Sequence, residues 1–390
     1  MKVLFAIDSM KGCLSSLECG KAAASGLRNA IPDAEPIVCP IADGGEGTTD
    51  AITMGLGGHF EEIEVTGPLG DKVNAKYGVI NTTDEDGTEK DIVIIEVSAA
   101  AGLTLIPEIS RDPMKTTTYG VGEMIKDALD KGYRHFIIGL GGSATNDMGI
   151  GMLQTLGVRF LDENGEELRS REYLMGGDME FIKSISMRKL DPRVEESTFR
   201  VACDVNNPLC GENGATYVFG PQKGLFEAEK PMMDSWMDNL SRIAAKDIGI
   251  EVNPEYPGCG AAGGLGFAFK YFLGAELEPG IKIIIEETGL KSKIKDADVI
   301  MTGEGRLDSQ SMMGKTPVGI AHIAKAFAKP VIVIAGSIAP EVDGEVLPDI
   351  DAYFSILRRP MELKTAMDPA IAKANIANTC EQIFRVLRLP

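Results

Sequence analysis

Lys2-Val-Leu-Phe-Ala-Ile7 opens the chain as an apolar run, and the polar segment Asp8-Ser-Met-Lys-Gly12 follows it directly. The run has the length of a buried β-strand and is far shorter than the about 20 apolar residues of a membrane-spanning helix. A helical pattern then extends from about Ser15 to Asn29, with Ser15 or Ser16 as its candidate N-cap. This order of strand, polar turn and helix predicts the first unit of a parallel sheet.

The same alternation recurs near both ends of the chain. A second strand is expected at Pro36–Pro40, and three more are expected near Ala297–Thr302, Val331–Ala335 and Ala352–Ser355. Helical segments separate them, of which Thr316–Ala328 has the clearest pattern. Five strands with helices between them favour an α/β domain with a flavodoxin-like parallel sheet.

The middle of the chain has a different pattern. The expected elements there are antiparallel strands at Glu61–Ile80 and Asp91–Val97, a helix at Tyr119–Lys131, strands at His135–Leu140, Val158–Leu161 and Phe199–Cys203, and a long helix at Lys230–Ile248. We interpret these elements as a second α/β domain, residues 61–289, inserted into a first domain formed by residues 1–60 and 290–390. A length of 390 residues fits two domains.

Composition narrows the class of protein. The chain has 44% hydrophobic and 25% charged residues, which is ordinary for a globular protein. A net charge of −19 argues against nucleic acid or an anionic membrane as a partner. No cleavage site follows the first strand, so we expect a cytoplasmic protein. The seven cysteines are odd in number and include no Cys-x-x-Cys, so we expect reduced thiols and neither disulfides nor a zinc site.

Two polar segments follow the first two strands. Asp8 and Lys11 place a carboxylate and an ammonium in one tight loop, which suits substrate binding, although a strand-end turn with a surface lysine is the alternative. The segment Ile41-Ala-Asp-Gly-Gly-Glu-Gly-Thr48 carries Asp43 and Glu46, which could accept a substrate proton or hold Mg²⁺. Asp-Gly pairs are also common turn formers.

The segment Gly139-Leu-Gly-Gly-Ser-Ala-Thr-Asn-Asp147 is the strongest signal of a ligand site. It leads from an apolar strand through glycines into hydroxyl and amide residues, and we expect a helix to start there. Backbone N–H groups and the hydroxyls of Ser143 or Thr145 would then face an anion. Asn146 and Asp147 add oxygens suited to a metal ion or a hydroxyl group.

Two further segments lie in the predicted inserted domain. In Cys203-Asp-Val-Asn-Asn-Pro-Leu209, Asp204 and Asn206 could position and deprotonate a hydroxyl group. In Tyr217-Val-Phe-Gly-Pro-Gln-Lys-Gly224, Lys223 could face a phosphate or a carboxylate. Asn-Pro and Gly-Pro are also frequent in turns. The glycine-rich run Pro257–Gly266 carries no catalytic side chain and fits either a hinge or a backbone phosphate site.

Thr302-Gly-Glu-Gly-Arg-Leu-Asp-Ser-Gln-Ser311 follows a strand of the first domain, and Gly314-Lys315-Thr316 opens the next helix. The first part nearly matches the dinucleotide fingerprint but has Asp308 in place of its third glycine. The second part resembles the end of a P-loop, yet Ser309 stands where the first glycine is required. A charged segment of this kind is poorly explained by folding alone.

Together these segments resemble the glycerate kinase family, in its bacterial two-domain form. The resemblance rests on seven motifs: Asp8-Ser-x-Lys-Gly12, Ala42-Asp-Gly-Gly-Glu-Gly47, Gly141-Gly-Ser-Ala-Thr-Asn-Asp147, Cys203-Asp-Val-x-Asn-Pro208, Phe219-Gly-Pro-Gln-Lys-Gly224, Gly263-Gly-Leu-Gly266 and Thr302-Gly-Glu-Gly-Arg-x-Asp-x-Gln310. It implies a flavodoxin-like domain with an inserted domain of endonuclease-like fold. It also implies ATP and Mg²⁺ as reactants and phosphorylation of D-glycerate on its 2- or 3-hydroxyl. Met10 and Cys13 depart from the family pattern, but neither removes a charged candidate.

On this resemblance we expect an active site in a cleft between the two domains, and we leave open whether the protein forms a homodimer. The expected catalytic residues are Lys11, Arg306 and a base that is either Asp43 or Asp204. The expected substrate-binding residues are Asp8, Lys11, Asn206, Lys223, Asp308 and Gln310. The expected phosphate-binding residues are Gly141, Gly142, Ser143, Thr145 and Lys315. The expected metal ligands are Glu46, Asp147 and Glu304, of which Mg²⁺ would take one or two.

Two rival classes remain at this stage. An NAD-dependent sugar-acid dehydrogenase would use the glycine-rich segments to bind a dinucleotide. The missing third glycine of the dinucleotide fingerprint argues against this class. A sensor without catalytic activity would bind a small acid and transfer nothing, but it would leave the many acidic residues in these segments unexplained.

Overall fold

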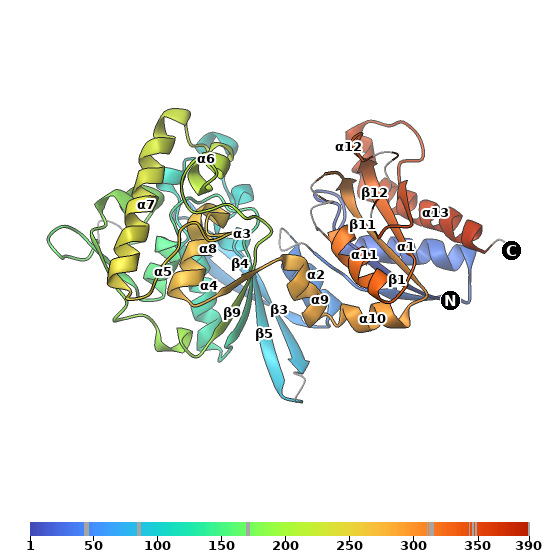
Figure 1. The fold of residues 1–390 in the computed structure, drawn as a ribbon, viewed down its shortest axis with the longest axis horizontal. Coiled ribbons are helices and arrows are strands. Elements are labelled where there is room, and N and C mark those ends of the chain that lie inside the picture. Colours follow the sequence, from blue (N-terminus) through green and yellow to red (C-terminus); the bar gives the residue numbers. More distant parts are fainter. Residues whose placement is uncertain are drawn as a thin grey trace. The chain divides into compact units, whose positions relative to one another are not determined.

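The computed structural model describes residues 1–42, 47–83, 87–168, 172–309, 311, 316–342, 344, 347 and 349–388. The chain folds into two compact units (Figure 1). The first unit comprises Met1–Asp43, Asp50–Gly57 and Ile281–Pro390, and the second comprises Gly44–Thr49 and Gly58–Gly280. Two segments far apart in the sequence therefore build the first unit, while the middle of the chain builds nearly all of the second.

The first unit contains a five-stranded parallel sheet, as the sequence predicted. Its strands are β1 (Lys2–Ile7), β2 (Glu35–Val38), β11 (Val299–Leu307), β12 (Val331–Ile338) and β13 (Ala352–Ser355). Their spatial order is β13-β12-β11-β1-β2, and every neighbouring pair is parallel. This order is that of a flavodoxin-like sheet, in which the chain reverses its direction of winding next to β1.

Helices cover this sheet. They are α1 (Ser16–Ala30), α2 (Thr48–Gly55), α9 (Gly280–Glu287), α10 (Leu290–Asp296), α11 (Thr316–Ala326), α12 (Leu363–Ala366) and α13 (Pro369–Leu387). Figure 1 shows α1 and α13 side by side, and the ring of Phe5 on β1 meets that of Phe384 on α13 at 6.1 Å between centroids. Ser15 is the N-cap of α1 and forms a capping box with Glu18. Ser16 instead donates from its hydroxyl to the carbonyl of Ile7 (2.6 Å), which fixes the turn after β1.

Strand β11 is longer than the sequence predicted. We expected it to end at Thr302, but residues 303–307 continue the strand and pair with β12, so that Glu304 lies opposite Ala335 and Leu307 opposite Ile338. A Cβ at Gly303 would collide with the carbonyl oxygen of Ile334, so the close approach of the two strands requires glycine there. The predicted loop is therefore in large part the end of a strand.

The second unit contains a six-stranded mixed sheet in the order β10-β9-β6-β5-β4-β3. Its strands are β3 (His59–Thr66), β4 (Lys72–Thr83), β5 (Glu89–Glu96), β6 (His135–Gly139), β9 (Thr198–Ala202) and β10 (Glu276–Glu278). Strands β3, β4 and β5 pair in antiparallel fashion, whereas β5, β6, β9 and β10 are parallel. A separate antiparallel pair joins β7 (Arg159–Leu161) to β8 (Ser184–Ser186).

The helices of the second unit pack around one large apolar core. They are α3 (Ser98–Ala101), α4 (Tyr119–Asp130), α5 (Ile150–Thr155), α6 (Ala215–Phe219), α7 (Lys230–Asp247) and α8 (Ala261–Phe272), together with 3₁₀ turns at Leu103–Leu105, Glu108–Ser110, Pro113–Lys115, Gly176–Phe181, Pro192–Val194, Pro221–Lys223 and Glu227–Glu229. The predicted helices at 119–131 and 230–248 are confirmed to within one residue at each end.

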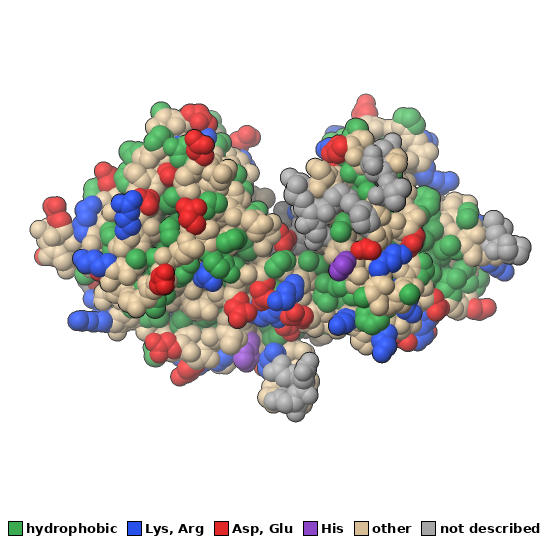
Figure 2. Space-filling model, in the orientation of Figure 1, with side chains coloured by type: hydrophobic (Ala, Val, Ile, Leu, Met, Phe, Trp, Pro, Cys, Tyr) green, Lys and Arg blue, Asp and Glu red, His purple; other side chains and the backbone are tan. Residues whose placement is uncertain are grey.

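Three further features concern membrane-spanning helices, cysteines and surface charge. No helix within the described ranges is long and apolar enough to cross a membrane. All seven cysteines are free. On the face shown in Figure 2, acidic and basic side chains are interspersed among the other side chains.

Candidate functional site

Three parallel strands of the second unit end at the same level of its sheet. Glu96 at the end of β5 pairs in register with Gly139 at the end of β6, and Gly139 pairs with Ala202 at the end of β9. The loops that follow these strands therefore start at one edge, which is where open α/β sheets bind their ligands. Two of the predicted site segments, Gly141–Asp147 and Asp204–Asn206, begin there.

The segment Gly141–Asp147, here called the β6 loop, is tied to its neighbours through its backbone. The carbonyl of Gly142 accepts from the N–H of Leu103 (2.9 Å), and the N–H of Ala144 donates to the carbonyl of Ala101 (2.8 Å). Within the described ranges, the N–H groups of the other six residues of this loop have no hydrogen-bond acceptor, namely those of Gly141, Gly142, Ser143, Thr145, Asn146 and Asp147. Gly142 is exposed and has a left-handed φ of 74°. Such a row of donors is suited to an anion.

The expected start of a helix inside the β6 loop is wrong. Met148 (φ 51°) and Gly149 (φ 75°) both adopt left-handed conformations, and α5 begins only at Ile150. This six-residue helix therefore starts beyond the predicted phosphate-binding residues. Any anion at the loop would be held by loop N–H groups and hydroxyls rather than by a helix end.

Asp147 lies fully buried with both carboxylate oxygens engaged. One oxygen accepts from the N–H (2.9 Å) and the hydroxyl (2.7 Å) of Thr118, and the other accepts from the N–H of Gly149 (3.1 Å). Burial raises the pKa of Asp147, and the hydrogen bonds from Thr118 and Gly149 oppose that rise. Thr118 is the N-cap residue of α4, so Asp147 joins the loop to the beginning of that helix.

Lys223 is also buried, with 2% of its surface exposed. Its ammonium group donates to the carbonyl of Thr145 (2.6 Å) and to the hydroxyl of Ser143 (3.2 Å). Burial lowers the pKa of Lys223 to about 7, and the negative charge of Asp147 opposes part of that shift. The structure thus places this predicted substrate-binding residue against the inner side of the β6 loop.

Two more side chains of the loop point into the protein. The Asn146 amide donates to the hydroxyl of Thr216 (3.0 Å). Among the described residues, neither the hydroxyl of Thr145 nor the carbonyl oxygen of the Asn146 amide has a hydrogen-bond partner, although both are buried. Buried polar groups usually find a partner, so these two atoms mark room for a ligand or a water molecule.

The glycine-rich run at 257–266 packs directly against the β6 loop. Ala262, Gly263 and Gly264 are left-handed (φ 51°, 68° and 91°) and kink α8. The carbonyl of Gly263 accepts from the N–H of Met148 (2.9 Å), and a Cβ at Gly263 would collide with the carbonyl oxygen of Thr145. These contacts are those of close packing, and they do not decide between the two roles expected for this run, a hinge and a backbone phosphate site.

Asp204 and Asn206 follow β9 and are exposed. The Asp204 carboxylate accepts from the N–H of Gly280 (2.9 Å), the first residue of α9. Glu96 plays a similar part at the end of β5, where its carboxylate accepts from the N–H of Thr49 (2.7 Å) in α2. Glu96 was not among the predicted residues. The only signal for it in the sequence is its place at the end of the apolar strand Asp91-Ile-Val-Ile-Ile-Glu96.

In the first unit, the predicted residues gather at the carboxyl ends of β1 and β11. Ile7 pairs with Gly303, and the N–H of Asp8 donates to the carbonyl of Gly303 (2.9 Å). Asp8 is buried, whereas Lys11 is exposed. The structure therefore brings the loop after β1 next to the end of β11, where Glu304 lies half-buried.

The charged side chains at the end of β11 are more open. The Arg306 side chain is 63% exposed, and its Nε lies 3.9 Å from a carboxylate oxygen of Asp308. The N–H of Asp308 donates to the hydroxyl of Ser311 (3.0 Å), which fixes the turn after the strand. Four other predicted residues, Asp43, Glu46, Gln310 and Lys315, lie outside the described residues.

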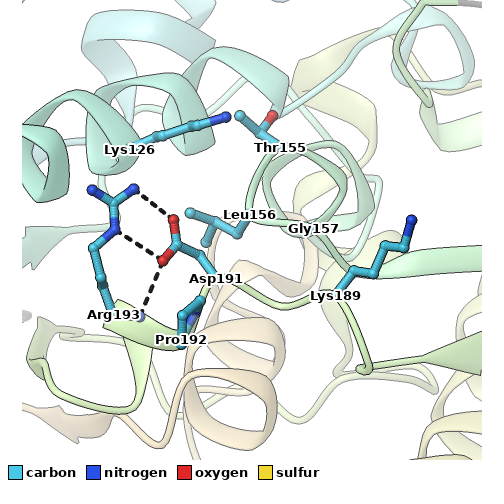
Figure 3. A pocket seen from close by; sticks show the side chains of 8 residues that line it. All are labelled: Lys126, Thr155, Leu156, Gly157, Lys189, Asp191, Pro192 and Arg193. Atoms are coloured by element: carbon cyan, nitrogen blue, oxygen red, sulfur yellow. Dashed lines mark hydrogen bonds and ion pairs between the residues drawn. The ribbon is translucent and has the colours of Figure 1, made fainter.

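A pocket of about 380 Å³ lies elsewhere in the second unit, lined by Lys126, Thr155, Leu156, Gly157, Lys189, Asp191, Pro192 and Arg193 (Figure 3). None of the predicted site residues lines it. The Arg193 guanidinium is held by both oxygens of Asp191 (2.9 and 2.6 Å), and Lys189 points away from the pair. The last residue of α5, Thr155, lies in its wall, and a helix C-terminus disfavours an anion. We do not assign this pocket to the reaction.

Comparison with known proteins extends over both units. The model of the glycerate kinase family matches residues 3–388. A glycerate kinase of Halalkalibacterium halodurans is 43% identical over 365 residues, which cover 94% of this chain and 93% of the relative. A glycerate 2-kinase of Escherichia coli K12 is 45% identical over 357 residues, which cover 92% of this chain and 91% of the relative. A crystal structure of a Salmonella typhimurium LT2 protein matches with a TM-score of 0.86 at 42% identity and covers 100% of this chain and 98% of that chain.

Proposed function

This chain belongs to the glycerate kinase family, and from this premise we propose that it phosphorylates D-glycerate on its 2-hydroxyl group, with ATP as the phosphoryl donor. The observation that carries the proposal is the 45% identity, over 92% of the chain, to a relative named for the 2-kinase activity. The structure adds a chemical basis for phosphoryl transfer, a reaction that asks a protein mainly to position its reactants and to neutralise charge.

The β6 loop is our candidate for the phosphate-binding element. Among its N–H groups without an acceptor, those of Gly141, Gly142, Ser143 and Thr145 offer donors to phosphate oxygens without requiring a positively charged side chain. This matters in a chain with a net charge of −19, which otherwise repels ATP and glycerate. Lys315, outside the described residues, remains a further candidate.

The open charged groups of the first unit are our candidates for contact with the reacting groups. Lys11 and Arg306 are exposed cations that can stabilise the charge of the transferred phosphoryl group. Asp8, Asp308, Asn206 and Gln310 are proposed to bind glycerate. We propose that residues of both units serve the same reaction.

The proposed base is Asp204, with Asp43 as the alternative. Asp204 is exposed at the end of β9, and its hydrogen bond from the N–H of Gly280 stabilises the ionised carboxylate that a base requires. It would accept the proton of the glycerate hydroxyl as that oxygen attacks the γ-phosphorus of ATP.

Mg²⁺ is the expected companion of ATP, and the residues present fit it in part. The ion prefers one or two carboxylates plus water and phosphate oxygens. Glu304, half-buried at the end of β11, is the described candidate, and Glu46 is another. Asp147 fits less well, because three protein donors already occupy its two oxygens. When bound, Mg²⁺ would neutralise phosphate charge and orient the γ-phosphoryl group.

A phosphorus NMR assay with purified protein, ATP, Mg²⁺ and D-glycerate tests the proposal. A new phosphomonoester signal that is a doublet in the proton-coupled spectrum identifies 2-phosphoglycerate, because the phosphorus then couples to one proton on carbon 2. A triplet identifies 3-phosphoglycerate and overturns the assignment of the hydroxyl group. Folded protein that leaves ATP and glycerate unchanged would overturn the kinase and favour a sensor. NADH binding, followed by fluorescence, would favour the dehydrogenase.

A further inference from the structure

Lys223 is placed too deep in the second unit to be an ordinary substrate-binding lysine. Its ammonium group is enclosed by the β6 loop, and two of its three N–H bonds point to Thr145 and Ser143. A cation without exposure to solvent needs such partners, because an isolated buried charge is costly. The contacts that replace water for Lys223 are therefore contacts to the loop itself.

Two buried charged side chains, those of Lys223 and Asp147, hold the β6 loop to other parts of the second unit. Lys223, at the end of the 3₁₀ turn Pro221–Lys223, holds Ser143 and Thr145, while Asp147 holds the loop to Thr118 at the start of α4. These two attachments lie at either end of the segment Ser143–Asp147. Together they fix the positions of the loop N–H groups that lack an acceptor.

The charge of Lys223 also sets the direction of one hydroxyl group. A lysine ammonium group has three donors and no acceptor. The oxygen of Ser143 must therefore accept from it, and the Ser143 O–H must point to another acceptor. A phosphate placed at the N–H groups of Gly141, Gly142, Ser143 and Thr145 would provide that acceptor, and its negative charge would favour the protonated form of Lys223.

We propose that Lys223 is a positioning residue that acts on phosphate groups only through Ser143 and Thr145 of the β6 loop, and that it does not touch the substrate. The proposal rests on the proposed function, because it assumes that this loop holds the phosphates of ATP. In this role, the ammonium group of Lys223 donates to the Ser143 oxygen and so orients the Ser143 O–H to donate to a phosphate oxygen.

A double-mutant cycle tests this dependence. We expect Lys223→Met to raise the KM for ATP roughly 10-fold or more, the usual effect of losing a hydrogen bond to a charged group. Ser143→Ala should raise it to a similar or smaller extent. Adding Ser143→Ala to Lys223→Met should then change the KM less than about threefold, because the hydroxyl has already lost its orientation. If the two effects multiply, or if Lys223→Met lowers kcat alone, Lys223 acts independently of Ser143 and the proposal fails.

Lys230→Met is the matched control. Lys230 is another buried lysine of the second unit, but its ammonium group binds Glu227 (2.6 Å) and not the β6 loop. This variant should leave the KM for ATP unchanged. An equal rise in both variants would mean that any buried lysine of this unit matters in the same way, which contradicts the proposal.

Hydrogen exchange separates this proposal from the proposed function. In Lys223→Met, peptides spanning residues 140–149 should exchange faster than in the unaltered protein, because the hydrogen-bonded N–H of Ala144 lies in the loop that Lys223 holds and that of Met148 follows the loop directly. Lys230→Met should leave them unchanged. This measurement needs no turnover: an unaltered protein that cannot phosphorylate glycerate refutes the function, whereas unchanged exchange in Lys223→Met refutes the role of Lys223.

Discussion

The β6 loop of the second unit and the end of β11 in the first unit look alike in sequence but differ in structure. Both combine glycines with acidic and hydroxyl residues. In the β6 loop, Ser143, Thr145, Asn146 and Asp147 are all buried, and their side chains mostly bind other parts of the protein. At the end of β11, the Arg306 side chain is exposed and that of Asp308 is partly exposed. Under the proposed function, the charged groups that approach a substrate and those that shape its site are thus divided between the two regions.

This division predicts that substitutions in the buried β6 loop mainly lower the free energy of unfolding. Substitutions of exposed side chains at the end of β11 should mainly lower the turnover of the enzyme. Side chains in the β6 loop are surrounded by partners that would be left without hydrogen bonds. The Arg306 side chain at the end of β11 can be removed without such loss, because it is 63% exposed and water replaces its contacts.

Asp147→Ala should have the largest effect on stability. The substitution leaves the N–H and hydroxyl of Thr118 and the N–H of Gly149 without an acceptor. Each buried donor without an acceptor costs about 1–3 kcal/mol, so we expect the free energy of unfolding to fall by roughly 3–5 kcal/mol. Urea denaturation followed by fluorescence of the single tryptophan, Trp236 in α7, reports on the second unit alone.

Asp162→Ala is the control for this prediction. The Asp162 carboxylate also accepts from two backbone N–H groups, those of Asn164 and Glu166, but it lies at an exposed turn. The substitution Asp162→Ala should therefore lower the free energy of unfolding by less than about 1 kcal/mol. An equal fall in the free energy of unfolding in Asp147→Ala and Asp162→Ala would show that burial does not make the β6 loop more sensitive than an exposed turn.

Arg306→Ala should have the opposite profile. We expect kcat/KM to fall roughly 10²–10³-fold, as when one group that stabilises transition-state charge is removed. The melting temperature should stay nearly constant, because the side chain is 63% exposed. Steady-state kinetics and a thermal melt measure both quantities, and Arg359→Ala, at another exposed arginine of the first unit, is the control. A variant that retains activity would remove Arg306 from the proposed mechanism.

Lys223 gives the buried region a dependence on pH. Burial lowers the pKa of Lys223 to about 7 from its ordinary value of 10.5. Between these values the unfolded chain binds more protons than the folded chain, so this residue makes the free energy of unfolding rise with pH. The slope is at most about 1.4 kcal/mol per pH unit.

The difference in unfolding free energy between the unaltered protein and Lys223→Met isolates this contribution from other titrating groups. As the pH rises from 7 to 9, we expect the free energy of unfolding of the unaltered protein to increase relative to that of Lys223→Met. Urea denaturation monitored through Trp236 at several pH values provides the measurement. A difference that stays constant would mean that Lys223 keeps its ordinary pKa when buried.

The sequence predicted the strands well where apolar runs carry the signal. The strand at Val3–Ile7 is apolar throughout and is followed by a polar turn, so its place in a parallel sheet could be inferred directly. The end of β11 could not be inferred in this way. Gly303, Glu304 and Arg306 have little strand preference, and they are extended because β12 pairs with them.

The sequence singled out the polar segments of the candidate site, but it did not predict the direction in which their side chains point. Lys223 and Asp147 looked like groups for substrate and metal, because charged residues in glycine-rich loops usually face solvent. Their burial depends on partners distant in the sequence, such as Thr118 for Asp147 and Thr145 for Lys223. No local pattern encodes these contacts.

Ser311→Ala should have the smallest effect of these substitutions. It tests whether the end of β11 depends on a buried side chain, as the β6 loop does. The buried Ser311 hydroxyl accepts from the N–H of Asp308 (3.0 Å) and donates to its carboxylate (3.4 Å), so it orients this partly exposed carboxylate. Losing one such bond costs about 0.5–1.5 kcal/mol, and we expect a rise in the KM for glycerate of roughly threefold with kcat unchanged. Ser309→Ala, at an exposed neighbour, should have no effect. If Ser311→Ala instead matches Arg306→Ala in its loss of turnover, the open strand end depends on buried support as strongly as the β6 loop does, and the contrast between the two regions does not hold.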